Sequence, residues 1–213
     1  MPEEKSGGDT STVKPRRRQA RGERRIAQLL EAAANVFCTT GYAAASTNSI
    51  AREAGVSPGT LYQFFPNKEA IAIELGDHLV TRWHTTYGEA LTQAHLELPL
   101  GELLDAVLDP LIQFNLENPA FAVLMQGSDI PGKVTLEHEN LHTSALARVG
   151  EILSGHLPDA EEADVSRIAR MTFSIFKGGL SLILAAGPEE RDAYSAELKT
   201  VLHRYLDPLI GCP

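Results

Sequence analysis

Residues 47–66, with the sequence TNSIAREAGVSPGTLYQFFP, constrain the fold more tightly than any other part of the chain. Gly55 stands where a sharp turn between two helices needs a left-handed backbone, and Ala51 is small enough for the helices to cross closely. Ser57 and Pro58 are typical of a helix start, because a capping serine is followed by proline at the first helical position. Apolar side chains at inward offsets are Ile50, Ala54, Val56, Leu61 and Phe64. The segment predicts a helix-turn-helix, a motif that places its second helix in the major groove of DNA.

The rest of the chain is also predicted to be helical. Apolar residues recur three and four positions apart after Arg21, and Gly41 is a stop signal for that helix. No stretch shows sustained period-two alternation with β-branched residues, so we expect an all-α fold of about nine helices. The expected helices span about 21–41, 47–54, 57–66, 67–95, 99–117, 119–126, 133–155, 160–186 and 188–210.

The charges divide the chain into a basic front and an acidic back. The net charge is −9, but residues 14–68 carry nine Lys or Arg against three acidic residues, whereas residues 71–213 carry nine against twenty-one. This asymmetry predicts that only the front faces phosphate. We expect a disordered basic arm at 1–20, a helix-turn-helix DNA-binding domain at 21–66, and a second helical domain at 67–213 that does not face phosphate.

The sequence shows no feature of export. Its first twenty-five residues contain no apolar stretch, and the apolar run at 178–187 is too short to cross a bilayer. Cys38 and Cys212 are the only cysteines, which argues against a disulfide framework, and Cys38 is expected to be buried on an apolar stripe. We therefore expect a cytoplasmic protein with no membrane partner and no cofactor.

Residues 37–71, FCTTGYAAASTNSIAREAGVSPGTLYQFFPNKEAI, closely resemble the DNA-binding domain of tetracycline-repressor (TetR) family regulators. The matching features are the aromatic-x-x-x-G-[Y/F] end of the first helix, the I-A-x-x-A-G-V-S core and the G-T-L-Y-x-x-F-x-x-K-E segment. Over the remaining two-thirds of the chain the resemblance is only architectural. It implies a homodimeric, ligand-responsive regulator with no enzymatic activity, most often a repressor that binds a palindromic operator.

The resemblance implies roles for residues around the helix-turn-helix. Gln63 is the best candidate for reading a base, because its amide can pair bidentately with adenine, and Thr60 can reach a base edge or a thymine methyl. Ser49 stands where an acid usually completes a capping box, which predicts a weaker cap. The expected DNA-binding residues, including an arm that enters the minor groove, are Arg16, Arg17, Arg18, Ser46, Thr47, Ser57, Pro58, Gly59, Thr60, Tyr62, Gln63 and Lys68.

The resemblance implies that residues 67–213 form an effector-binding and dimerisation domain that holds a small hydrophobic or aromatic effector. It also implies that the last two helices of each subunit form a four-helix bundle, and these helices carry more apolar surface than one intrachain face needs. The apolar residues concerned are Ile168, Met171, Phe173, Ile175, Phe176, Leu180, Ile183, Leu198, Val201, Leu202, Tyr205 and Leu209. The candidate effector-binding residues are Trp83, Tyr87, Phe114, Phe121, Met125, His142 and Phe173.

Residues 138–142, HENLH, leave an alternative open. His138 and His142 would lie one helical turn apart with Glu139 beside them, which is the spacing of two zinc ligands and a general base in metalloproteases. Glu162 would be a distant third ligand, but it follows a break at Gly155–Pro158 that fixes no geometry. The first alternative is therefore a zinc-dependent hydrolase that uses His138, Glu139 and His142. A second alternative is a DNA-binding regulator with no small-molecule effector.

Overall fold

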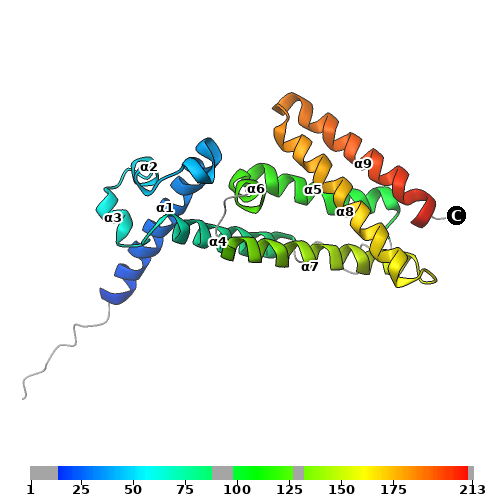
Figure 1. Cartoon of the computed structure of the whole chain (residues 1–213), viewed down its shortest axis with the longest axis horizontal. Helices are drawn as coiled ribbons and strands as arrows, with labels where there is room; N and C mark the ends of the chain where they lie inside the picture. Colours follow the sequence, from blue (N-terminus) through cyan, green and yellow to red (C-terminus); the bar gives the residue numbers. More distant parts are fainter. Residues whose placement is uncertain (1–13, 88–97, 127–131, 211–213) are drawn as a thin grey trace, which may run out of the picture. The chain divides into compact units, whose positions relative to one another are not determined.

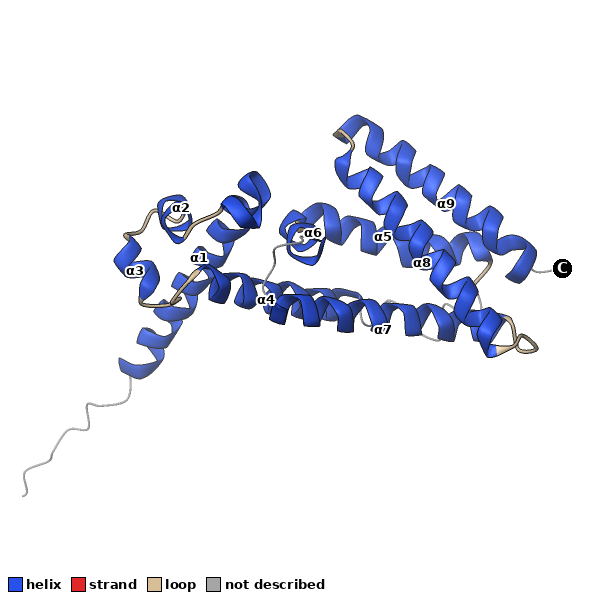
Figure 2. Ribbon diagram, viewed as in Figure 1, coloured by secondary structure: helices blue, strands red, loops and turns tan. Residues whose placement is uncertain are grey.

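The computed structural model describes the backbone of residues 14–87, 98–126 and 132–210, and the side chains of residues 20–85, 98–125 and 142–210. Within these ranges the chain forms nine helices and no strand (Figure 2), which confirms the expected all-α fold. The chain divides into two compact units after Ile71, rather than after Pro66 as expected.

The first unit contains three helices: α1 (Lys14–Ala44), α2 (Thr47–Glu53) and α3 (Pro58–Tyr62) (Figure 1). Leu29, Phe37, Ile50 and Leu61 are fully buried and form its core. Gly41 breaks the helical backbone of α1 at φ 75°, which confirms it as a stop signal. The boundaries differ mainly at the front, since α1 begins at Lys14.

Two expectations for the first unit were wrong. Residues 14–20 are helical and do not belong to a disordered arm. Arg, Lys, Gln and Ala have good helix propensity, and proline is tolerated in a first turn, so this basic segment can extend the helix without an apolar stripe. Cys38 is exposed rather than buried, because the buried face of α1 in this stretch is formed by Ala33, Val36 and Phe37 and Cys38 lies at its edge.

The second unit is a helical bundle that begins within α4 (Lys68–Tyr87). It contains α5 (Leu100–Glu117), α6 (Pro119–Gln126), α7 (Gly132–His156), α8 (Glu162–Ala185) and α9 (Pro188–Ile210). The helix α8 packs against α7 and α9, and α9 also packs against α5 (Figure 1). The buried core of these four helices consists of Leu104, Leu108, Ile112, Leu153, Val165, Ala169, Leu180, Ile183, Leu198, Leu202 and Leu206.

Two local features hold α9 in the bundle. Lys199 on α9 donates a hydrogen bond to Asp105 on α5 and also lies close to Asp109, with Nζ–Oδ1 distances of 2.7 and 2.6 Å. Burial lowers the pKa of Lys199, but the hydrogen bonds and charges of both carboxylates outweigh burial and raise it. At the α8–α9 crossing, Gly179 faces the buried side chain of Leu198.

Much of the apolar surface of α8 and α9 is left uncovered. Five large apolar side chains of these two helices are at least 40% exposed, and we call them the exposed apolar set: Met171, Leu182, Tyr194, Val201 and Leu209. Among the described helices, only α8 is long and apolar enough to cross a membrane. Its most apolar 18-residue stretch has a mean hydropathy of 1.4, and 17% of that stretch is buried. The apolar run at 178–187 is thus part of a longer apolar helix, which Val165, Ala169, Leu180 and Ile183 anchor in the bundle core.

Candidate nucleic-acid interface and ligand cavity

The turn between α2 and α3 has the backbone that its sequence predicted. Gly55 lies in the left-handed region at φ 64°, and the next amide, Val56 N, donates to Ala51 O at 2.9 Å. The side chain of Gln28 on α1 donates to the carbonyl of Ala54 at 2.7 Å. These bonds satisfy the end of α2 and fix the angle at which α3 leaves it.

Two serines cap α2 reciprocally. Ser49 N donates to Ser46 Oγ at 3.1 Å, and Ser46 N donates to Ser49 Oγ at 3.0 Å. Both bonds of a capping box are present, although serine replaces the usual acid. The box is geometrically complete, but it lacks the negative charge that would favour the positive end of the helix.

The first turn of α3 is exposed, whereas Leu61 in the same helix is buried. Ser57 Oγ accepts a hydrogen bond from Thr60 N at 3.1 Å and lies 2.9 Å from Thr60 Oγ1, so the two hydroxyls are already paired. Ser57, Pro58 and Gly59 are exposed, whereas Leu61 is fully buried. This turn can present its backbone and small side chains to a partner while Leu61 holds the helix in place.

Tyr62 and Gln63 extend this exposed surface at the end of α3. Tyr62 is 53% exposed, and its hydroxyl lies 3.0 Å from Thr47 Oγ1 at the start of α2. Gln63 is also exposed. The structure thus brings hydroxyl groups of α2 and α3 together, a pairing that sequence spacing did not indicate.

Lys68 makes internal contacts that sequence reasoning missed. Its ammonium donates to the carbonyls of Tyr42 and Ala43 at 2.7 and 3.1 Å, and lies 4.4 Å from the centroid of the Tyr42 ring. These are carbonyls at the end of α1, where a cation is favourable. Two of its three donors are therefore engaged within the protein, which leaves one for an external group.

The side chains of Arg16, Arg17 and Arg18 lie outside the described residues, although their backbone belongs to the first turns of α1.

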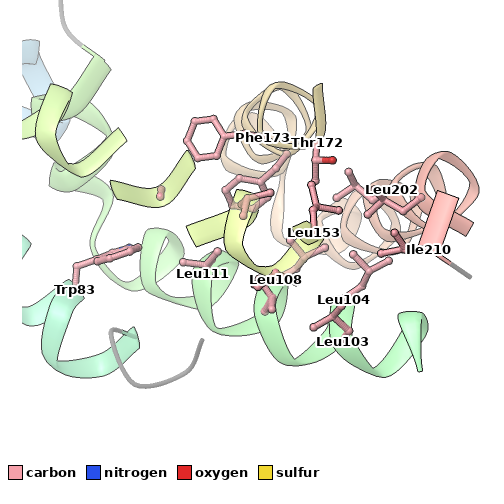
Figure 3. A pocket seen from close by; sticks show the side chains of 16 residues that line it. Trp83, Leu103, Leu104, Leu108, Leu111, Leu153, Thr172, Phe173, Leu202 and Ile210 are labelled. Atoms are coloured by element: carbon pink, nitrogen blue, oxygen red, sulfur yellow. The ribbon is translucent and has the colours of Figure 1, made fainter. Parts of the chain in front are cut away.

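The second unit contains a cavity of about 100 Å³ between α5, α7, α8 and α9, with Trp83 of α4 at its edge (Figure 3). The described part of its lining is almost wholly hydrocarbon and contains no charged side chain. The lining residues are Trp83, Leu103, Leu104, Val107, Leu108, Leu111, Ala145, Val149, Ile152, Leu153, Thr172, Phe173, Phe176, Leu202, Leu206 and Ile210. Aliphatic residues of this kind look like ordinary core in a sequence, which is why most of them were missed.

The candidate effector-binding residues are only partly brought together. Trp83 and Phe173 line the cavity. Phe114 and Phe121 are buried against each other, edge to face at 5.1 Å, and with the buried Met125 they do not line it. The side chain of Tyr87 lies outside the described residues.

His142 contacts the cavity wall rather than the cavity itself. Its ring lies edge to face with Phe173 at 4.5 Å, and Phe173 is a lining residue. Burial, with a smaller effect of the charge on Lys177, lowers the pKa of His142. The neutral ring is therefore favoured beside this apolar wall.

Most of the HENLH motif lies outside the described side chains, including His138 and Glu139. Among the side chains that are described, no group of three or more His, Cys, Asp or Glu is placed to hold a metal ion.

Comparison with known proteins identifies the same two parts. Residues 29–75 match the family described as "Bacterial regulatory proteins, tetR family", and residues 99–206 match "Tetracyclin repressor-like, C-terminal domain". The Bacillus subtilis (strain 168) "Fatty acid metabolism regulator protein" is 44% identical over 48 residues, which are 22% of this chain and 25% of that protein. The "HTH-type transcriptional regulator EthR" of Mycolicibacterium smegmatis is 36% identical over 85 residues, or 38% of this chain and 39% of that relative.

These alignments span well under two-thirds of the length of either relative. The fold likeness extends further. A TetR-like transcriptional regulator from Rhodococcus sp. RHA1 superposes with a TM-score of 0.68 at 20% identity, covering 85% of this chain and 95% of that one. With both family regions matched along this chain, the protein belongs to the TetR family of DNA-binding transcriptional regulators, whose members are not enzymes.

Proposed function

We propose that the protein is a homodimeric repressor that binds a palindromic operator through α3 and releases it when a small apolar effector occupies the cavity of the second unit. The observation that carries the DNA-binding part is the exposed first turn of α3, held from behind by the fully buried Leu61. A protein whose targets are chromosomal operators acts in the cytoplasm.

The polar groups around α3 divide into two proposed roles. Gln63 reads a base edge, and the exposed backbone at Gly59 allows close approach to the groove. The hydroxyls of Ser46, Thr47 and Tyr62 contact phosphate, since neutral donors on a recognition motif fix its register on the duplex. Lys68 contributes its remaining donor and its charge, and the methyl group of Thr60 contacts a thymine methyl.

The exposed apolar set supports a dimer through α8 and α9. A single helix-turn-helix reads too few bases to select an operator, and two half-sites require a two-fold dimer. Side chains such as Met171, 48% exposed, and Leu182, 56% exposed, gain burial only against another surface. A second copy of the same helices offers a matching apolar surface.

The cavity supports an apolar effector that must enlarge it. At about 100 Å³ it is smaller than the roughly 300–1,000 Å³ of ordinary ligand pockets. Binding therefore requires the four surrounding helices to move, and this movement is the proposed signal. The name of the Bacillus subtilis relative, a regulator of fatty acid metabolism, is consistent with an apolar effector.

The zinc-hydrolase alternative is rejected, because the chain belongs to a family of regulators that are not enzymes. A regulator without a small-molecule effector remains the competing proposal, and the cavity in Figure 3 argues against it.

Capture of genomic fragments by the purified protein, followed by binding measurements on the recovered operator, tests the proposal. Gln63→Ala should relax preference at one base position, by about 1–3 kcal/mol of discrimination. Tyr62→Phe should weaken binding to all sequences alike, because it removes a hydroxyl that carries no base information. Gln113→Ala, the same change at an exposed position of α5, is the control. A monomer with no affinity for any fragment at low ionic strength would refute the proposal.

A further inference from the structure

One hydroxyl in the cavity wall has no hydrogen-bond partner among the described residues. Thr172 lies on α8 and lines the cavity, and its Oγ1 atom is buried (Figure 3). A buried hydroxyl that has lost its water and gained no partner is unfavourable, so such groups are rare in native proteins.

The other helical hydroxyls show what Thr172 does differently. A buried or half-buried Ser or Thr in a helix usually donates to the carbonyl four residues earlier. Bonds of this kind, at 2.8–2.9 Å, are made by Thr81, Thr85, Ser195 and Thr200. Thr172 does not use this backbone acceptor, and its hydroxyl presents almost no surface to the cavity in its present size, so it can pair with a molecule only when that molecule enlarges the cavity.

The rest of the lining limits what that molecule can be. Among the side chains that the structure describes, none that lines the cavity is charged, and Thr172 supplies the only oxygen. A carboxylate or ammonium group placed there would lose its hydration without gaining an opposite charge. A water molecule is also a poor occupant, since a buried water needs two to four polar partners.

We propose that the effector is a neutral, mainly apolar molecule whose single hydroxyl or carbonyl oxygen forms a hydrogen bond with Thr172 Oγ1. The threonine hydroxyl both donates and accepts, so an alcohol, a phenol or a ketone satisfies it. This inference rests on the proposed function, in which the cavity is the effector site, and it excludes ligands whose charged group must enter the cavity.

Calorimetry on the full-length protein without DNA tests this inference with three probes of matched shape: benzyl alcohol, toluene and benzoate. Thr172→Val replaces the hydroxyl by a methyl group of similar size. The ratio of the Kd for benzyl alcohol to the Kd for toluene should rise at least about fivefold in this variant, the effect of one lost hydrogen bond. Benzoate should bind the wild type at least about tenfold more weakly than benzyl alcohol.

Two further variants control the measurement. Thr200→Val makes the same change at a hydroxyl that is bonded to Ala196 O and does not line the cavity, so the ratio should stay at the wild-type value. Thr172→Ser keeps the hydroxyl and should also keep that ratio, and the benzoate comparison on the wild type still tests the inference if the valine variant fails to fold.

An unchanged ratio in Thr172→Val, benzoate binding as tight as benzyl alcohol binding, or no binding of any probe would each overturn the inference. Operator capture is measured separately. A protein that binds operator but fails the calorimetric test refutes only the ligand class, whereas one that passes it and binds no DNA refutes the proposed function.

Discussion

Replacement of Gly179 by alanine should destabilise the second unit through a steric clash at the α8–α9 crossing. A Cβ atom at this position would lie 2.5 Å from Leu198 Cδ1 and 2.9 Å from both Cδ2 and Cγ. Contacts this short require movement, and Leu198 has little room for it because it is 5% exposed within the bundle core.

The magnitude follows from two opposing effects. Overpacking a core by one methyl group costs about 1–3 kcal/mol. Alanine in place of glycine within a helix gains about 0.5–1 kcal/mol. The clash therefore prevails, with a net loss of about 1 kcal/mol in the free energy of unfolding, or about 2–4 °C in Tm for a chain of this size. Urea titration at fixed protein concentration measures it, since the proposed dimerisation would make stability depend on concentration.

Two controls isolate the clash from helix propensity. Gly150→Ala on α7 places its Cβ in open space, so this variant should be more stable than the wild type. Leu198→Ala alone should cost about 2–5 kcal/mol, but combined with Gly179→Ala the total should fall short of the sum by at least about 0.5 kcal/mol, because the new methyl group partly fills the vacated space. A Gly179→Ala protein as stable as the wild type, or strictly additive costs, would refute the reasoning.

Three shorter predictions follow from other contacts. Lys199→Met should lower the free energy of unfolding by about 1 kcal/mol at neutral pH, since it removes both carboxylate contacts but keeps the apolar stem. The folded-state pKa of Lys199 is raised above 10.5, so this stabilisation is complete below pH 10.5 and is lost above it, and urea titrations should show the two proteins converging at alkaline pH. Leu182→Glu should give a monomer in sedimentation experiments, with operator affinity reduced alongside. Lys68→Met should lower both the melting temperature and the DNA affinity, whereas an unchanged melting temperature would contradict its bonds to the α1 carbonyls.

The fold was predictable where the ends of helices are marked by residues that favour one local structure. Ser57 with Pro58 and Gly187 with Pro188 define helix starts, and the structure places α3 and α9 there. The start of α1 was missed because residues 14–20 have helix propensity but no apolar stripe, and periodicity detects only helices that pack. The exposure of Cys38 was missed for a related reason, since a small side chain at the edge of a stripe can face either way.

The site was predictable only in part, because sequence gives the residue types but not their pairings. The exposed surface of α3 follows from the motif, whereas the Ser46–Ser49 box depends on side-chain rotamers. Lys68 has a charge suited to phosphate, yet its nearest acceptors are carbonyls of its own unit. Phe114 and Phe121 were predicted to bind the effector because they are aromatic, but they pack against each other. The leucines and valines that surround the cavity were not predicted.

The arrangement of α8 suggests how the proposed effector binding and the proposed dimerisation would be linked. Thr172 and Phe173 face the cavity, whereas Met171 and Leu182 lie on the opposite, exposed side of the same helix. An effector that needs more than about 100 Å³ must displace α8 or its neighbours, and a packed helix moves as a unit. Effector affinity should therefore differ between the dimer and the Leu182→Glu monomer, by about 5–150-fold if the coupling is of ordinary size. Calorimetry on both proteins measures this difference, and equal affinities would show that α8 does not carry the signal.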